Sequence, residues 1–263
     1  MQRDWVAAVL RDAIDTVSTD PTIATRWGTP LIGFADARDE GFQKLKNELI
    51  PGHLLPEEIL QRPTVVISYF LPFLPETTDS NRGEGLASFD WARAYEETNS
   101  LLGKIGLLLV ERLQQAGFHA ELPEAASHFD RERLVSAWSQ RHIAVMAGLG
   151  TFGLNNMLLT DAGCSGRLGS VVTDAPFAPD TPLQQERCLF KKNGSCGKCA
   201  DACPAGALLR TGYDRQKCFA QCLKNAERYT DLGSSYAGNS AGSEVCGKCI
   251  AGMPCAHWKQ RRA

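Results

Sequence analysis

The cysteines of this chain are concentrated in one short region, and they constrain the fold more than any other feature. Nine of the ten cysteines lie between Cys188 and Cys255, and Cys164 is the exception. The N-terminus carries no apolar run long enough for an export signal, so we expect a cytoplasmic protein. In a reducing compartment, clustered thiols are more often metal ligands than disulfides. The sequence therefore predicts a metal-binding region in the C-terminal third.

The spacing of these cysteines is typical of iron–sulfur proteins. Residues 196–204 read Cys-Gly-Lys-Cys-Ala-Asp-Ala-Cys-Pro, which matches the last three cysteines and the proline of the bacterial ferredoxin motif C-x2-C-x2-C-x3-C-P. Asn193 occupies the position of the first cysteine of the motif, so we expect Cys188 to replace it. We also expect a helix that starts at Cys203 and continues through residues 205–209.

Eight of the cysteines fit two [4Fe–4S] clusters, because each cluster requires four ligands. In the crossed arrangement of such motifs, the first set is Cys188, Cys196, Cys199 and Cys255. The second set is Cys203, Cys218, Cys246 and Cys249. Two tetrahedral zinc ions are the alternative, since each also binds four cysteines. Cys164 and Cys222 are left over, and we expect both to be small buried residues.

The rest of the chain predicts an α+β fold. Apolar residues recur at helical spacing over residues 3–17, 36–49 and 91–116. Residues 64–70 form a β-branched, almost wholly apolar strand, which we expect to be covered on both faces. Further strands are expected at residues 29–34, 118–122, 157–160 and 169–173. Prolines over residues 174–182 predict a boundary between an α/β sandwich-like domain, 1–180, and a small ferredoxin-like two-cluster domain, 181–263.

A glycine-rich segment precedes that boundary. Gly148, Gly150 and Gly153 satisfy the dinucleotide fingerprint G-x-G-x-x-G, which requires a strand before it and a helix after it. Here a helical pattern over residues 136–147 comes first and a strand follows, so we reject a Rossmann site. We expect the glycines to let the backbone approach a flat cofactor or substrate closely, and a tight helix-to-strand turn is the alternative.

The chain resembles the epoxyqueuosine reductase family and its iron–sulfur relatives. The resemblance rests on Ala-Gly-Leu-Gly-Thr-Phe-Gly-Leu-Asn at residues 147–155, on Gly-Ser-Val-Val-Thr at residues 169–173, and on the cysteine motif. It implies a cobalamin-binding α+β domain fused to a two-cluster module that reduces the corrinoid cobalt. In that family, the cobalamin-dependent reaction removes the epoxide oxygen of a tRNA nucleoside.

Three departures from the family pattern make us expect a different substrate. The family has an acidic stretch, D-x-G-P-x-x-E, ahead of the glycines, and its first residue corresponds to Leu134, which carries no acid. The interval from Cys249 to Cys255 is longer than usual in the family. The chain also stops eight residues after Cys255 without a helical-repeat extension that could grip tRNA. We therefore do not expect tRNA to be a partner.

Polar residues around the glycines are the remaining site candidates. His142 and Asp130 are the candidate proton donors, although a helix histidine is more often simply solvated or hydrogen-bonded. The candidate cofactor-binding residues are the three glycines with Trp138, Arg141, Asn155, Asn156 and Arg167.

These features together predict an iron–sulfur reductase. Electrons from a ferredoxin or flavodoxin would pass through two clusters to a corrinoid or small-molecule substrate in the N-terminal domain. Two alternatives stay open: an electron carrier or activator that serves another corrinoid enzyme, and a zinc-stabilised binding module. The net charge of −2 gives no bulk attraction to nucleic acid or to an anionic membrane, and no apolar run approaches the length of a bilayer span.

Overall fold

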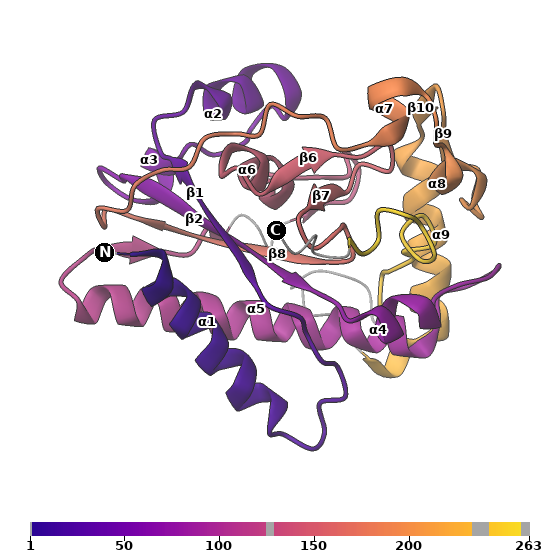
Figure 1. Ribbon diagram of the computed structural model, residues 1–263, viewed down its shortest axis with the longest axis horizontal. Coiled ribbons are helices and arrows are strands. Elements are labelled where there is room, and N and C mark those ends of the chain that lie inside the picture. The colour runs from indigo at the N-terminus through magenta and orange to yellow at the C-terminus, as the bar shows by residue number, and fades with distance from the viewer. Residues whose placement is uncertain (1, 125–128, 233–241, 259–263) are drawn as a thin grey trace.

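The centre of the molecule is a four-stranded antiparallel sheet with the order β1-β2-β8-β3 (Figure 1). The computed structural model describes residues 2–124, 129–232 and 242–258. The strands of the sheet are β1 (Leu31–Asp36), β2 (Val65–Pro72), β3 (Ala120–Glu121) and β8 (Gly166–Thr173).

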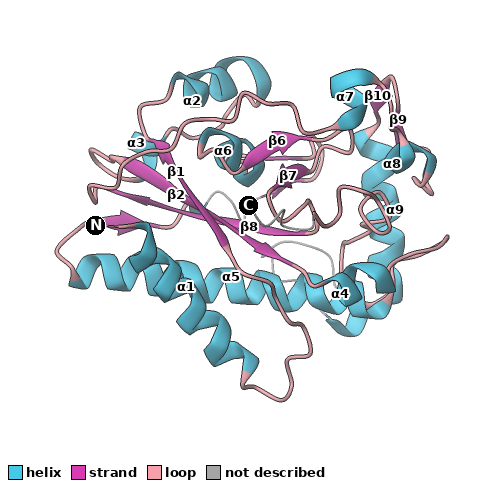
Figure 2. Cartoon of the chain, in the orientation of Figure 1, coloured by secondary structure: helices cyan, strands magenta, loops and turns pink. Residues whose placement is uncertain are grey.

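Helices cover both faces of this sheet (Figure 2). One face carries α1 (Arg3–Ser18) and α5 (Phe89–Gln115), and the other carries α6 (Gln140–Met146). Shorter helices before α5 are α2 (Glu40–Lys44), the π-helix η1 (Leu45–Leu49), α3 (Pro56–Ile59) and α4 (Pro75–Ser80). Two short hairpins flank α6, namely β4 (Phe129–Asp130) with β5 (Val135–Ser136) and β6 (Gly150–Phe152) with β7 (Leu158–Thr160).

The cysteine-rich region consists of short elements and one longer helix. They are α7 (Leu189–Asn193), α8 (Lys198–Asp201), the hairpin β9 (Leu208–Leu209) and β10 (Gly212–Tyr213), α9 (Arg215–Arg228) and η3 (Thr230–Leu232). Asp214 begins α9, since its carboxylate accepts a hydrogen bond from the Lys217 N–H at 3.0 Å. Within the described ranges, no helix has the length and apolar character that a bilayer span requires.

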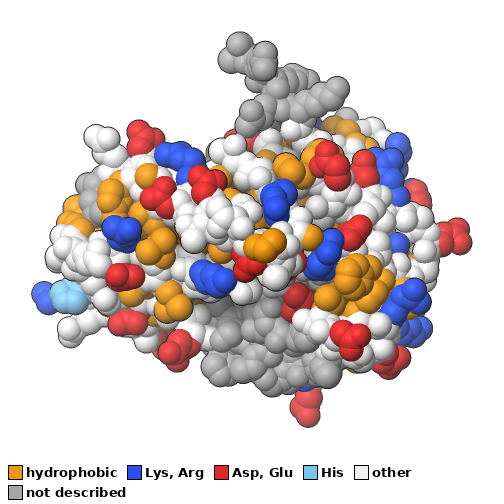
Figure 3. All heavy atoms as spheres, turned by 90° about the horizontal axis from the view of Figure 1, so that it is seen from below, with side chains coloured by type: hydrophobic (Ala, Val, Ile, Leu, Met, Phe, Trp, Pro, Cys, Tyr) orange, Lys and Arg blue, Asp and Glu red, His pale blue; other side chains and the backbone are white. Residues whose placement is uncertain are grey.

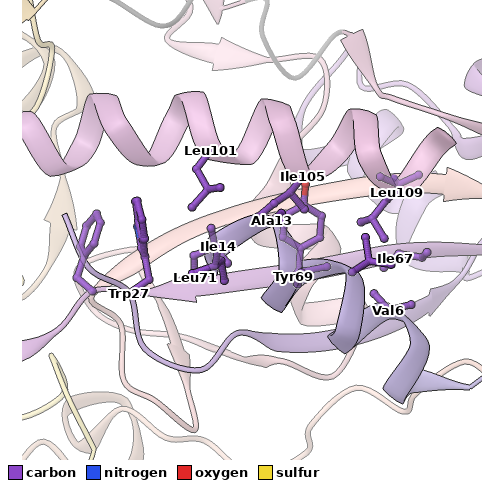
Figure 4. Packing of buried hydrophobic residues seen from close by; sticks show 14 of the residues in the cluster. Val6, Ala13, Ile14, Trp27, Ile67, Tyr69, Leu71, Leu101, Ile105 and Leu109 are labelled. Carbon is purple, nitrogen blue, oxygen red and sulfur yellow. The ribbon is translucent and has the colours of Figure 1, made fainter. Parts of the chain in front are cut away.

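The composition of β2 explains why it lies at the centre of the sheet. All eight of its residues are buried, and successive side chains point to opposite faces. Ile67 and Tyr69 pack beneath α5 (Figure 4), whereas Val66 belongs to the core beneath α6. Burying each such side chain stabilises the fold by about 1.5–3 kcal/mol. The prediction of a strand covered on both faces is therefore confirmed.

The core beneath α5 extends into the cysteine-rich region. Val245, Ile250 and Ala256 belong to the same buried cluster as Trp91 and Leu101 of α5. The body and the cysteine-rich region thus share hydrophobic contacts across the predicted boundary. The division into domains 1–180 and 181–263 stays a prediction, while the α+β class is confirmed.

The prediction of a helix that starts at Cys203 is wrong. The helical turn precedes this cysteine, as α8, and residues 208–209 form strand β9 instead. Gly206 has a φ of +57°, in the left-handed region that ends a helix. The chain turns there, and the Leu208 N–H donates to the Cys203 Sγ at 3.4 Å. The expected helix over residues 136–147 also starts later, at Gln140.

Two glycine-to-alanine substitutions test this packing. A Cβ on Gly33 would collide with the Ala147 carbonyl at the end of α6, so Gly33→Ala should lower the free energy of unfolding by about 1–3 kcal/mol. Gly103 lies in α5 with open space around it, so Gly103→Ala should raise that free energy by about 0.5–1 kcal/mol. Urea unfolding followed by tryptophan fluorescence measures both, and equal effects of the two variants would contradict the described contact of α6 with β1.

Candidate functional site

Four cysteines from separate parts of the chain line one cavity of about 110 Å³. They are the members of the predicted first set: Cys188, Cys196, Cys199 and Cys255. Cys188 immediately precedes α7, whereas Cys255 lies in the last described loop. Leu159 and Trp258 add apolar walls. The structure therefore brings together the cysteines that the motif spacing assigned to one cluster.

Four cysteines can hold either one zinc ion or one [4Fe–4S] cube. Four thiolates on one zinc ion lie about 3.8 Å apart, because each zinc–sulfur bond is about 2.3 Å in a tetrahedron. Among the residues that the structure describes, no three His, Cys, Asp or Glu side chains are close enough to hold one metal ion. The four cysteines of the first set instead surround a cavity, so a [4Fe–4S] cube placed there would have four cysteines around it.

The second set also converges. Burial is the main reason why the pKa of the Cys249 thiol is raised, and charge on Cys246, Cys218 and Cys203 raises it further. Cys199 of the first set acts on the same thiol. The Cys249 thiol therefore lies within electrostatic range of the other three members of the second set and of Cys199 of the first set.

The two remaining cysteines lie beside the predicted ligands. Cys164 is buried, and its Sγ lies 4.0 Å from the Sγ of Cys255. A hydrogen bond with Cys222 is the largest of the effects that lower the pKa of Cys218, to about 6. The same hydrogen bond and burial raise the pKa of Cys222.

The glycine-rich segment packs against the protein's own backbone. A Cβ on Gly148 would lie 2.8 Å from the Thr181 carbonyl oxygen, and one on Gly150 would collide with the Leu159 carbonyl. A Cβ on Gly153 would lie 2.6 Å from the Asn155 Oδ1. The segment joins α6 to β6, so the helix-first order that excluded a Rossmann site is confirmed. The cofactor-binding role of the glycines stays a prediction.

Two asparagines tie this segment to its surroundings. The Asn155 Nδ2 donates to the Cys249 carbonyl oxygen at 3.0 Å, which connects the segment to the second set. Asn156 adopts a φ of +58°, and its carbonyl accepts a hydrogen bond from the Arg141 Nη1 at 2.6 Å. Asn155 therefore positions a ligand-bearing loop, and Asn156 positions Arg141.

Arg141 lies near Cys218 of the second set and near Tyr213, whose charges both act on its guanidinium. Desolvation by surrounding protein lowers its pKa, yet the side chain is exposed to solvent. Tyr213 is 42% exposed, and desolvation nevertheless raises its pKa, with Cys218 as its hydrogen-bonding neighbour. Sequence reasoning missed Tyr213, because one tyrosine in a short hairpin belongs to no recognisable motif.

Trp138 and Arg167 occupy different surroundings from Arg141. Trp138 is 1% exposed, and its indole N–H donates to the Ser170 Oγ at 3.0 Å within the core beneath α6. The Arg167 guanidinium lies over the Tyr95 ring of α5, 4.1 Å from its centroid. Arg167 is still close enough to contribute to the lowered pKa of Arg141. Trp138 therefore acts as a core residue in this structure, and its predicted cofactor contact is not among its described contacts.

The two candidate proton donors differ in their surroundings. His142 is half-buried, its Nδ1 lies 2.7 Å from the Ser139 Oγ, and burial, aided by the Arg141 charge, lowers its pKa to about 4. Its ring is therefore neutral at pH 7. Asp130 is exposed, and its carboxylate accepts the backbone N–H groups of Glu132 and Arg133 at 2.9 Å each, which stabilises the turn of the β4–β5 hairpin. Both catalytic roles stay predictions.

Comparison with known proteins identifies relatives of this chain. No protein-family model matches it. Epoxyqueuosine reductase of Bacillus anthracis is 30% identical over 264 residues, which cover 89% of this chain and 63% of that protein. Tetrachloroethene reductive dehalogenase of Desulfitobacterium hafniense is 35% identical over 121 residues, or 41% of this chain and 20% of the dehalogenase. The chain thus spans less than two thirds of the length of these relatives.

A solved structure shares the fold and corrects one prediction. Epoxyqueuosine reductase in complex with an epoxyqueuosine-modified tRNA-Tyr stem loop matches 98% of this chain with a TM-score of 0.52 and 21% identity, and 68% of that chain is covered. We excluded tRNA because the chain lacks a helical-repeat extension, and that exclusion is wrong: a reductase of this fold was solved with a tRNA stem loop. The sequence identity over 89% of the chain and the shared fold support the family that the sequence motifs indicated, that of the epoxyqueuosine reductases and their iron–sulfur relatives.

Proposed function

We propose that this protein is an iron–sulfur reductase that carries electrons through two [4Fe–4S] clusters to a corrinoid. The observation that carries the proposal is the cavity lined by the whole first set of cysteines. The relatives support the proposal, since one is an epoxyqueuosine reductase and the other is a reductive dehalogenase.

The cysteines of each set would hold one cluster as thiolates. Clusters of this type store and pass single electrons, at potentials set by burial and by hydrogen bonds to sulfur. The chain supplies both influences. Cys164 lies against Cys255 in the first set, and Cys222 hydrogen-bonds Cys218 in the second. The electrostatic contact of Cys199 with Cys249 supports a relay between neighbouring sets.

The surface at Arg141 and Tyr213, beside the second set, is the proposed corrinoid and substrate site. Arg141 and Tyr213 offer hydrogen-bond donors there, next to Cys218 of the second set. Arginine suits the phosphate and amide oxygens of a corrinoid, because its guanidinium presents several donors in a fixed plane. When bound, cobalamin supplies the reducing cobalt centre. The protein positions the ligand and keeps a cluster close to it.

The proposal includes a polar residue different from the family's acid. Leu134, at the position of that acid, adopts a φ of +55° and carries no ionisable group. We assign to His142 a hydrogen bond to the group that is reduced, because its neutral ring carries one N–H and lies near Arg141. With a pKa of about 4 the ring holds this proton and does not transfer it. A changed donor supports a substrate that differs from epoxyqueuosine in the group to be reduced. The epoxyqueuosine-modified tRNA stem loop serves as the reference substrate. Turnover of this stem loop as fast as that of any other substrate would contradict the proposed difference in substrate.

Single Cys→Ser variants test the cluster assignment. Protein prepared without oxygen should contain about eight iron and eight sulfide per chain. Serine at any member of either set should remove about four of each, because one cube loses a ligand. Cys164→Ser and Cys222→Ser are the matched controls and should retain both clusters. Zinc in place of iron would contradict the proposal.

A cobalamin titration tests whether the corrinoid binds at Arg141. The visible spectrum of hydroxocobalamin should change on addition of the cluster-loaded protein. Arg141→Ala should weaken the affinity about tenfold, as expected for the loss of one charge-assisted hydrogen bond. Arg38→Ala, which removes an exposed guanidinium elsewhere, should not change the affinity. An unchanged affinity of Arg141→Ala for hydroxocobalamin would exclude the surface at Arg141 as the corrinoid site.

The pH dependence of turnover tests His142. Because its pKa is lowered to about 4, the ring is neutral throughout pH 6–8. His142→Gln should therefore reduce turnover about a hundredfold, by the same factor at pH 6 and pH 8. His119→Gln, at an exposed histidine, is the control. Full activity of His142→Gln, or a loss seen only at pH 6, would contradict the proposed hydrogen bond from the neutral His142 ring.

A further inference from the structure

The surface over the first-set cavity is basic and partly apolar. Lys191 and Lys192 lie on α7, Lys198 begins α8, and all three are exposed. Leu189, the first residue of α7, is 50% exposed. Leu189 and Lys198 also line the cavity itself. We call these four residues the α7–α8 surface, and Figure 1 shows both helices on the same side of the molecule.

The lysines of this surface keep their charge free for a partner. Among the described residues, none of the three forms an ion pair within 4.0 Å of a carboxylate. Lys191 instead donates to the Phe152 carbonyl oxygen at 2.7 Å, which fixes α7 against β6. The basic side chain nearby that is neutralised is Arg210, which pairs with Asp201. The three lysines thus form a positively charged area in a chain whose net charge is −2.

The face beneath the sheet differs from this arrangement. Figure 3 views the molecule from below, and acidic and basic side chains are interspersed there. On α5, for example, Arg93 pairs with Asp90 at 3.0 Å. The α7–α8 surface is therefore a local feature. Two of its exposed residues, Leu189 and Lys198, line the cavity in which the first-set cluster is proposed to lie.

We propose that the α7–α8 surface docks an acidic one-electron carrier of the flavodoxin or ferredoxin class. The inference rests on the proposed function, because it requires a cluster in the first-set cavity. Lysines steer an acidic partner into place and set the association rate. Leu189 supplies an apolar contact from which water is excluded. On docking, one electron leaves the reduced carrier and reduces the 2+ cluster to the 1+ state, with no bond made or broken.

Nucleic acid is the competing partner for a lysine-rich surface. Single-stranded nucleic acids bind to basic grooves that also carry aromatic side chains on which bases stack. The exposed apolar residue here is the aliphatic Leu189, which offers no stacking plane. The surface also borders the cysteine cavity, which an electron donor must approach and a nucleic acid need not. These features favour the carrier.

Charge reversal tests the inference with cluster-loaded protein. Lys192→Glu/Lys198→Glu should lower the second-order rate of cluster reduction by reduced flavodoxin about tenfold at low salt, and should weaken the dependence of that rate on salt. Bleaching of the visible absorption in a stopped-flow instrument gives the rate. Photoreduced deazaflavin, which is uncharged, should reduce variant and parent equally. Lys44→Glu/Lys104→Glu makes the same charge change at exposed sites elsewhere and should leave the flavodoxin rate unchanged.

The outcomes separate this inference from the proposed function. Equal flavodoxin rates in the variant and the parent would overturn the docking surface while leaving the clusters in place. An unchanged flavodoxin rate with lost affinity for a tRNA stem loop would assign the surface to nucleic acid instead. Protein that contains no iron or acid-labile sulfide would refute the proposed function itself, before any carrier is added.

Discussion

The convergence of distant cysteines on a shared core is the constraint on which the rest of the structure depends. Cys255 reaches the first-set cavity because Val245, Ile250 and Ala256, which precede and follow it, are buried in the core beneath α5. The same core holds α5 against the central sheet. Packing in the body therefore fixes the position of ligands that lie far apart in the sequence. Binding of a cluster would in turn stabilise that packing, because ligands held in the folded chain favour folding.

The glycine-rich segment connects the cysteine-rich region to Arg141. The glycine-rich segment passes from α6 into β6 against protein backbone, and Asn155 and Asn156 extend from its end. One asparagine holds the Cys249 carbonyl and the other holds Arg141. A single short segment thus sets the position of both the loop that carries Cys249 and the Arg141 side chain. In the proposed function, this coupling would keep a cluster next to the corrinoid.

Sequence reasoning predicted the parts of the molecule in which local pattern and tertiary packing agree. The apolar run of β2 and the amphipathic α5 behave as their periodicity indicates, and the four cysteines that the motif spacing assigned to the first set line one cavity. It failed where a few residues override the pattern. The left-handed Gly206 ends the expected helix, and Tyr213 acquires its role from neighbours that only the fold supplies. The exclusion of tRNA failed for another reason, since it rested on the lack of a helical extension after Cys255 and not on any residue that could contact a nucleic acid.

The central claim is that each cysteine set holds a cube of iron and sulfide and not a single ion. Native mass spectrometry of protein purified without oxygen measures this directly, because the mass added to the chain identifies the bound inorganic groups. The account predicts a mass increase that corresponds to two Fe₄S₄ units, with loss of one unit as the first intermediate on mild activation. An increase that corresponds to two zinc ions, or no increase at all, would contradict it.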